Sequence, residues 1–571
     1  MDGTQQPARQ PTRQQLWICR FTDAQQRALA PGGDGPLAGI PFAVKDNIDI
    51  AGVPTTAGFP ALERLPTSTA TAVGRLIEAG AIPVGKTNLD QFATGLVGTR
   101  SPYGACHAVG HPEHVSGGSS SGSAVAVACD AARFALGTDT AGSGRVPAAF
   151  NGLVGVKPTR GLVSASGVVP ACRSLDCVSV FATTVADAAA VLRVLAAFDP
   201  ADPYSRPKPA HLPHIAADPR VIAVPAADAG LDLDPPHRAA WQAALAHARK
   251  IADQVVEIDI GPFLETARLL YQGPWLAERW HAIAPLLGEA GLDHPGLDPA
   301  VRRVLTDAGS ITGADAFAGF DRLAGLRRAA EPVWQTADAL LLPTTPGHPT
   351  LAEVAADPLG VNSRLGTYTN FVNLLDLAAI AVPAAARADG LPFGIQLIAP
   401  AFTDDLLLSL AARWTGEPEQ RTPDPPARPG WTRLAVVGAH LSGLPLNGQL
   451  LDLGAHLHRR TRTAPGYRLY RLPSGPGPAR PGLYRTGDTA TSTGIAAELW
   501  ELPQQAVGAL LETVPAPLAF GRLTLADDTQ ALGFIAQGPV PDGALDITGF
   551  GGWRSYLDTA ERSERDCSSA P

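Results

Sequence analysis

The residues most able to do chemistry lie in one Gly- and Ser-rich segment, Ser116 to Thr159. A loop of Gly and Ser leads into a helix of small residues, then into a strand over 134–136, and then into a second Gly-rich loop. Gly lets the chain turn sharply and lets a ligand approach the main chain, so such loops can aim backbone N–H groups at a developing negative charge. The flanks are apolar, which argues against a flexible linker. The pattern predicts a site that stabilises an oxyanion.

Lysine is the second candidate because it is scarce in this chain. Only five of the 45 basic residues are lysines, namely Lys45, Lys86, Lys157, Lys208 and Lys250. A desolvated lysine can lose its proton and act as a base, whereas arginine keeps its charge in proteins. A lysine inside an apolar run is therefore a candidate base.

Two other interpretations of the Gly- and Ser-rich loop are weaker. The spacing of Gly117 to Ser123 is similar to that of a phosphate-binding loop, but no lysine precedes the serine to reach the outer phosphates. The run Gly118 to Gly122 (GSSSG) matches the nucleophile elbow, which would make Ser120 the nucleophile. That elbow follows a strand, and residues 103–116 are rich in Gly, Pro and His, so we expect an irregular segment there.

Four spaced motifs together resemble the amidase signature family. They are GGSS, GTDTxGS, RxPAAF and GxKPT, at Gly117 to Ser120, Gly137 to Ser143, Arg145 to Phe150 and Gly155 to Thr159. The resemblance covers about residues 36–410. It implies an α/β fold in which a mixed β-sheet core is surrounded by helices.

The resemblance also implies a catalytic relay. In it, Ser143 is the nucleophile, Ser119 is the bridging serine, and Lys45 within PFAVKDN is the base. An amide nitrogen leaves only when protonated, and a relay that first takes the proton of Ser143 can return it to that nitrogen. The implied oxyanion hole consists of the backbone N–H groups of Thr140, Ala141, Gly142 and Ser143, with Ala141 where many family members have Gly.

Further residues resemble one branch of this family, the allophanate hydrolases. They are Gly144 after the nucleophile, the run Tyr271 to Trp280 (YQGPWLAERW), and the run Val436 to Asn447 (VVGAHLSGLPLN) in the second domain. Allophanate carries a carboxylate, which Arg279 could bind through two parallel hydrogen bonds while Tyr271 offers a hydroxyl. Gly273 and Pro274 interrupt the helix between these two residues, so both side chains could face one pocket.

Several alternatives stay open at this point. The chain could be an amidase of other specificity, including a biuret or malonamate hydrolase, or a noncatalytic subunit or scaffold. His440 in the second domain could be a base or a structural histidine, and that domain could be catalytic, a dimer scaffold, or both. His107, His111 and His114 with Cys106 could suggest zinc, but they lie in the expected irregular segment and the relay needs no metal, so we expect no metal and no cofactor.

Apolar runs alternate with helical patterns over the first 425 residues, which favours an α/β fold. We expect strands in Gly39 to Ile50 and in IPVGKT, and helices over 69–81 and 183–198. The amidase domain is predicted at 1–425, with a Pro-rich linker at 415–430. A smaller α+β domain of γ-glutamylcyclotransferase-like fold, implied by the resemblance, is predicted at 431–557, and a flexible tail at 558–571.

Charge and hydropathy exclude some partners. With a formal net charge of −9 the chain lacks a basic field for nucleic acid, and no run is long and apolar enough for a membrane span. Without a secretory signal, we expect a cytoplasmic protein. We expect a homodimer. The only methionine is Met1, so the M-K-M motif for biotin attachment is absent and a biotin-dependent urea carboxylase would be a separate chain.

Overall fold

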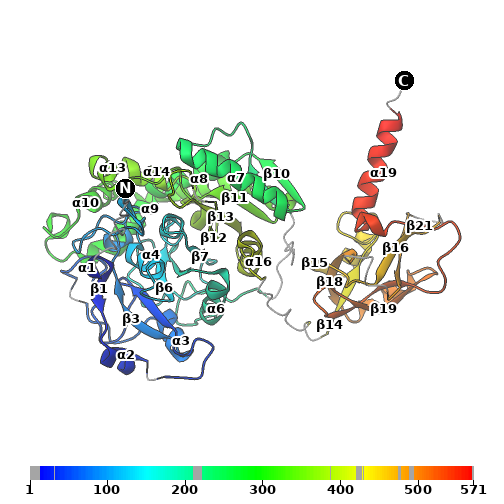
Figure 1. The fold of residues 1–571 in the computed structure, drawn as a ribbon, viewed down its shortest axis with the longest axis horizontal. Helices are drawn as coiled ribbons and strands as arrows, with labels where there is room; N and C mark the ends of the chain where they lie inside the picture. Colours follow the sequence, from blue (N-terminus) through cyan, green and yellow to red (C-terminus); the bar gives the residue numbers. More distant parts are fainter. Residues whose placement is uncertain are drawn as a thin grey trace, which may run out of the picture. The chain divides into compact units, whose positions relative to one another are not determined.

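The computed structural model describes residues 13–30, 32–62, 64–209, 221–385, 387–418, 427, 430–473, 478–487 and 494–568. These residues form two compact units, one within Met1–Pro209 and Pro219–Arg421 and the other within Thr422–Pro571 (Figure 1). The predicted linker at 415–430 lies mostly outside the described residues. The domain boundaries therefore stay predictions.

An 11-stranded mixed sheet forms the centre of the larger unit, as the sequence predicted. Its strands in spatial order are β1 (Trp17–Arg20), β3 (Ile82–Thr87), β2 (Pro41–Lys45), β6 (Phe134–Asp139), β8 (Cys177–Ala182), β7 (Val154–Lys157), β12 (Leu377–Pro383), β13 (Gly394–Pro400), β11 (Ala339–Pro343), β9 (Val221–Pro225) and β10 (Gln254–Ile258). β2 runs parallel to both β3 and β6. Every residue of β6, β8 and β11 is buried, which explains why these strands are mostly apolar and do not alternate between apolar and polar residues.

Helices surround this sheet (Figure 1). They are α1 (Arg13–Leu16), α2 (Asp23–Leu29), α3 (Thr71–Glu78), α4 (Ser121–Ala128), α5 (Val146–Phe150), α6 (Val185–Leu195), α7 (Pro235–Ile251), α8 (Gly261–Gln272), α9 (Trp275–Ile283), α10 (Pro299–Ala308), α11 (Gly313–Ala330), α12 (Val333–Thr336), α13 (Leu351–Ala356), α14 (Gly360–Leu365), α15 (Phe371–Leu374) and α16 (Asp404–Thr415). The helices expected over 69–81 and 183–198 are α3 and α6. The side chain of Thr184 caps α6 by accepting the Asp187 N–H, as its Thr-rich start indicated.

The smaller unit is an α+β structure around a five-stranded sheet. That sheet consists of β15 (His456–Arg462), β18 (Ala496–Pro503), β14 (Trp431–Val436), β20 (Gln530–Ala536) and β19 (Leu518–Thr524). A three-stranded sheet and three helices complete the unit, namely β17 (Pro481–Arg485), β16 (Tyr467–Arg471), β21 (Leu545–Asp546), α17 (Asn447–Asp452), α18 (Ala506–Glu512) and α19 (Trp553–Ser568). α19 extends into the segment for which we expected a flexible tail, 558–571, so that part of the chain is helical as far as Ser568.

None of the helices in the described part of the chain is long and apolar enough to cross a membrane.

Candidate active site

Lys45 is the last residue of β2 and its side chain is fully buried. Because β2 runs parallel to β6, the end of β2 lies beside the motif that follows in β6. Lys45 Nζ donates to Ser119 Oγ at 2.8 Å and to Thr138 Oγ1 at 2.7 Å. The structure therefore brings together the two residues that the sequence assigned as base and bridging serine.

The loop before α4 holds Ser119 where no side chain could replace the preceding glycines. Gly117 has a φ of +74°. A Cβ on Gly118 would lie 2.0 Å from Asp90 Oδ2 and 2.5 Å from the backbone nitrogen of Gly98, so only glycine fits. The backbone N–H of Asp90 also donates to the carbonyl oxygen of Ser119 at 3.0 Å. The Gly pair of the motif thus lets the loop pack directly on the segment from Asp90 to Gly98.

Ser143 lies in the turn between β6 and α5, and it is buried. Its Oγ donates to the carbonyl oxygen of Gly95 at 3.5 Å, a long contact. Asp139 anchors the turn because it pairs with Arg145 at 2.9 Å with both side chains fully buried. Burial would raise the pKa of Asp139, but the Arg145 guanidinium overrides this and holds that pKa below its usual value.

The oxyanion hole expected from the sequence needs one correction. The Gly142 N–H donates to Asp139 Oδ1 at 2.8 Å, so it is already used to hold the turn. Among the described residues, no acceptor is found for the N–H groups of Thr140, Ala141 and Ser143. Gly142 has a φ of +140°, a backbone conformation that favours glycine. Glycine at this position therefore allows the turn that arranges these N–H groups. Three of the four expected donors therefore remain free for a ligand.

Gly144 follows the candidate nucleophile for a packing reason. A Cβ at this position would lie 2.6 Å from the Cβ of Ser179 on β8 and 3.2 Å from that of Asp139. Its N–H donates to Asp139 Oδ2 at 3.0 Å. A bulky residue does not fit unless β8 moves, so in this chain Gly144 reflects close packing of the turn on the sheet.

Tyr271 and Arg279 lie on two helices, at the end of α8 and within α9. Gly273 and Pro274 separate these helices, as predicted. Arg279 is buried, and its Cζ lies 5.6 Å from the centre of the Tyr271 ring. Arg279 Nη1 donates to Thr94 Oγ1 at 2.8 Å. Ser143 contacts Gly95, and Gly95 directly follows Thr94 in the sequence. The candidate nucleophile Ser143 and the candidate carboxylate-binding residue Arg279 therefore contact adjacent residues.

The environment of Lys45 favours a neutral amine. Burial is the largest influence and lowers its pKa to about 7, against the opposing fields of Asp90, Asp176 and Asp139. Lys86, also buried, instead forms an ion pair with Asp46 at 3.0 Å. The hydrogen-bond partners of Lys45 are hydroxyl groups, which accept from an ammonium but do not fix its charge.

The nucleophile elbow fails for a different reason from the one the sequence suggested. We expected no strand before the loop, but β5 (His111–Val115) ends directly before Ser116 and pairs with β4 (His107–Ala108). Ser120 Oγ donates to the carbonyl oxygen of Thr138 at 3.2 Å and accepts its N–H at 3.3 Å. Ser120 therefore fastens the loop to β6 and is not aimed at a ligand.

The described residues contain no group of His, Cys, Asp or Glu side chains that could hold a metal ion.

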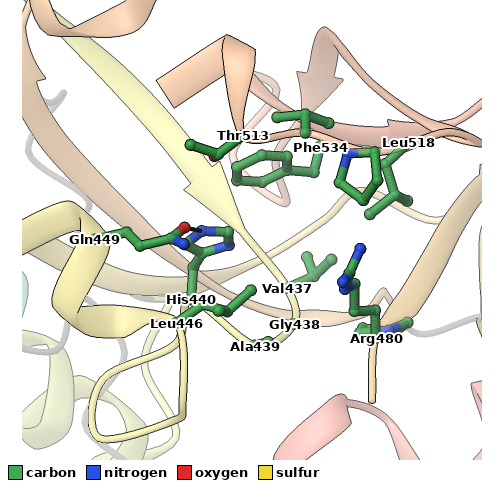
Figure 2. A pocket seen from close by; sticks show the side chains of 13 residues that line it. Val437, Gly438, Ala439, His440, Leu446, Gln449, Arg480, Thr513, Leu518 and Phe534 are labelled. Carbon is green, nitrogen blue, oxygen red and sulfur yellow. Dashed lines mark hydrogen bonds between the residues drawn. The ribbon is translucent and has the colours of Figure 1, made fainter. Parts of the chain in front are cut away.

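His440 lines a cavity of about 110 Å³ in the smaller unit. Figure 2 shows it between Gln449 and Phe534, with Arg480 lining the same cavity. The His440 and Phe534 rings stack at 4.9 Å, and His440 Nε2 is 3.0 Å from Gln449 Oε1. Burial lowers the pKa of His440, so the ring is neutral near pH 7. His440 and the relay residues lie in separate units.

Sequence reasoning missed two parts of the site. Thr138 contacts Lys45 and was visible inside the GTDTxGS motif, where a polar side chain in a buried strand is a signal. Thr94 with Gly95 and Asp176 come from segments without such a signal. Thr94, Gly95 and Asp176 lie near the candidate site because the fold brings these segments close to Arg279, Ser143 and Lys45.

Two family models match the chain. The Amidase model matches residues 16–408, and the model for the Allophanate hydrolase C-terminal domain matches residues 432–558.

Relatives and solved structures are similar over one or both units. Urea amidolyase of Lachancea kluyveri is 43% identical over 93% of this chain, although the chain spans only 30% of that relative. A glutamyl-tRNA(Gln) amidotransferase component of Synechococcus sp. (strain CC9605) is 35% identical, over 66% of this chain and 83% of the relative. The structure of selenomethionine-substituted allophanate hydrolase of Kluyveromyces lactis is 40% identical with a TM-score of 0.72, over 97% of this chain and 95% of that chain.

Proposed function

The chain belongs to the amidase family, and on that premise we propose that it hydrolyses the terminal amide of allophanate (urea-1-carboxylate). The observation that carries the proposal is the buried contact from Lys45 Nζ to Ser119 Oγ in a chain that also matches the allophanate hydrolase C-terminal domain. An allophanate hydrolase structure that aligns with both units supports the choice of substrate.

In the proposed mechanism, Lys45, Ser119 and Ser143 form the relay. Neutral Lys45 takes the hydroxyl proton of Ser119, and Ser119 takes that of Ser143 while the Ser143 oxygen attacks the amide carbon. The same path returns the proton to the leaving nitrogen, which departs as ammonia, and water then cleaves the acyl-enzyme. The N–H groups of Thr140, Ala141 and Ser143 hold the oxyanion, each contributing about 3 kcal/mol by comparison with similar donors.

Arg279 is the proposed partner of the substrate carboxylate. A guanidinium has five N–H donors, and the Thr94 contact uses one of them, so the others can bind a carboxylate in parallel. Tyr271, next to this guanidinium, would supply a hydroxyl to the same substrate. A neutral amide would leave the buried cation of Arg279 without its partner, which favours substrates with a carboxylate.

The product of this step is N-carboxycarbamate, which loses carbon dioxide and ends as a second ammonia. We propose that the smaller unit acts on this later decarboxylation or on assembly. The cavity lined by His440 and Arg480 supports the first of these roles, with His440 as the candidate functional residue beside the nitrogen that gains a proton as carbon dioxide leaves. A full-length His440→Ala variant should release the first ammonia at the normal rate and evolve carbon dioxide more slowly.

Three proposals about the wider setting rest on the same premise. We propose that a separate biotin-dependent urea carboxylase supplies allophanate to this enzyme. We also propose that the protein forms a homodimer and that it is located in the cytoplasm.

The test is a comparison of ammonia release from allophanate, biuret, malonamate and propionamide, for the natural chain and for Arg279→Gln. We expect the highest kcat/KM with allophanate, and a loss of about 100-fold in Arg279→Gln for the two carboxylate substrates only. Highest activity on propionamide would show a general amidase. A folded chain that releases no ammonia from any amide would indicate a noncatalytic scaffold.

A further inference from the structure

The turn formed by Ala171 to Asp176, here named the 171–176 turn, lies between the oxyanion loop and helix α9. It precedes β8, and the N–H groups of Leu175 and Asp176 both donate to the carbonyl oxygen of Cys172. Asp176 closes the turn from within, because its carboxylate accepts the Ala171 N–H at 2.9 Å and the Cys172 N–H at 3.2 Å. The carboxylate therefore has a fixed orientation.

On one side, this turn holds the oxyanion loop. Thr140 Oγ1 donates to Asp176 Oδ1 through a short hydrogen bond. Asn373 also connects the turn to the residue before Thr140. Its Nδ2 donates to the carbonyl oxygens of Leu175 at 2.9 Å and Asp139 at 2.8 Å. Thr140 is the first residue of the oxyanion loop, Thr140 to Ser143, whose N–H groups are the proposed oxyanion donors, so a fixed Thr140 side chain helps to fix the first proposed donor.

On the other side, the turn holds α9. The N–H and Oγ of Ser174 donate to the two carboxylate oxygens of Glu278, at 2.7 and 2.8 Å. Cys172 Sγ also donates to the carbonyl oxygen of Trp275 at 3.5 Å. Glu278 directly precedes Arg279 on α9, so the turn helps to hold the helix that carries Arg279.

We propose that Asp176 is a positioning residue for amide hydrolysis, which holds the oxyanion loop through Thr140 in register with α9 and Arg279. The part of this proposal that involves Arg279 rests on the proposed function. The hydrogen bond between Thr140 and Asp176 would matter for hydrolysis of any amide. A substrate held at its carboxylate by Arg279 would then meet the oxyanion donors at one set distance, and errors in such a distance slow the reaction rather than weaken binding.

The charge of Asp176 affects the pKa of Lys45, so the pH profile of activity can distinguish a positioning role of Asp176 from a role in packing alone. The carboxylates facing Lys45 are Asp90, Asp176 and Asp139. Asp139 is paired with Arg145, and Asp90 accepts the N–H groups of Gly98 and Arg100. Asp176 raises the pKa of Lys45, so its neutralisation should lower that pKa and move the acidic limb of the pH profile to lower pH.

The experiment uses full-length Asp176→Asn, Thr140→Val and Thr140→Ser, with the best substrate of the four-amide panel. We expect kcat to fall by about tenfold or more in Asp176→Asn and in Thr140→Val, with KM changed by less than about threefold, and Thr140→Ser to restore most of the activity. Only Asp176→Asn should move the acidic limb. The double variant should lose no more than the worse single variant, because both remove one contact.

Asp404→Asn is the matched control. Asp404 also accepts a backbone N–H and a threonine hydroxyl, both from Thr159, but it touches neither the oxyanion loop nor α9. It should lose stability without losing kcat. Unchanged kcat in Thr140→Val would overturn the proposal even if Asp176→Asn fails to fold. Multiplied losses in the double variant would overturn it when both single variants fold. Because each variant is compared with the natural chain on the same substrate, a preference for another amide would refute only the proposed function.

Discussion

Lys45 Nζ donates to Ser119 Oγ at 2.8 Å across 74 positions of sequence, and both side chains are buried. Since the second partner of Lys45, Thr138, is also a hydroxyl, the buried amine has no carboxylate among its hydrogen-bond partners in the described part of the chain. This is the arrangement in which a lysine is most easily deprotonated.

Replacing Lys45 by arginine should be as damaging as replacing it by alanine. A guanidinium keeps its proton in proteins and cannot accept another, so both variants should lose about 1,000-fold or more in kcat/KM for ammonia release. Lys208→Arg is the control, because Lys208 is exposed and pairs with Asp405. Substantial activity in Lys45→Arg would mean that Lys45 supplies only charge.

Removing the Ser143 hydroxyl should abolish hydrolysis and leave the fold intact. Ser143→Ala has no nucleophile, so neither ammonia nor an acyl-enzyme in mass spectrometry is expected. Ser120→Ala separates this assignment from the nucleophile elbow. That variant loses both hydrogen bonds with the Thr138 backbone, each worth about 1 kcal/mol in the free energy of unfolding, but it should keep turnover. Near-normal turnover in Ser143→Ala would reject the assignment.

The pH profile of kcat/KM should rise through about pH 7. Lys45 acts as a base only when neutral, and burial, the largest influence, lowers its pKa to about 7 in the free enzyme. Below that pH the amine is protonated and activity falls about tenfold per pH unit. Rate measurements from about pH 5 to about pH 9 at low substrate concentration test this. An acidic limb near the ordinary lysine pKa would contradict a desolvated base.

The larger unit alone should still release the first ammonia. Within the predicted linker at 415–430, the structure places the cut after Glu417, because Glu417 accepts the N–H groups of Val185 and Ala186 at the start of α6. A chain ending at Pro418 keeps this cap, which is worth about 1 kcal/mol. Thermal unfolding of Glu417→Gln in the full-length chain measures the cap.

We expect the shortened chain to release ammonia from allophanate with kcat within about threefold of the full-length chain, since the proposed first-step residues all precede the cut. A folded chain of this length without amidase activity would show that the smaller unit helps to build the first site.

The sequence by itself predicted the contact between Lys45 and Ser119 and the general fold, whereas the role of Ser143 stays a prediction. Lys45, Ser119 and Ser143 lie in motifs that can be recognised in the sequence, and Gly142 beside Ser143 has a φ of +140° that favours glycine. The apolar runs predicted the mixed sheet and the helices α3 and α6 because burial and capping act over a few residues.

Only the tertiary structure decided which groups are free to act. The N–H of Gly142 is used by Asp139, and Gly144 is dictated by Ser179 across the sheet. The connection from Asp176 to Thr140 joins segments that no local pattern relates. Hydrogen-bond partners and burial depend on contacts between distant parts of the chain, which periodicity and motif spacing do not encode.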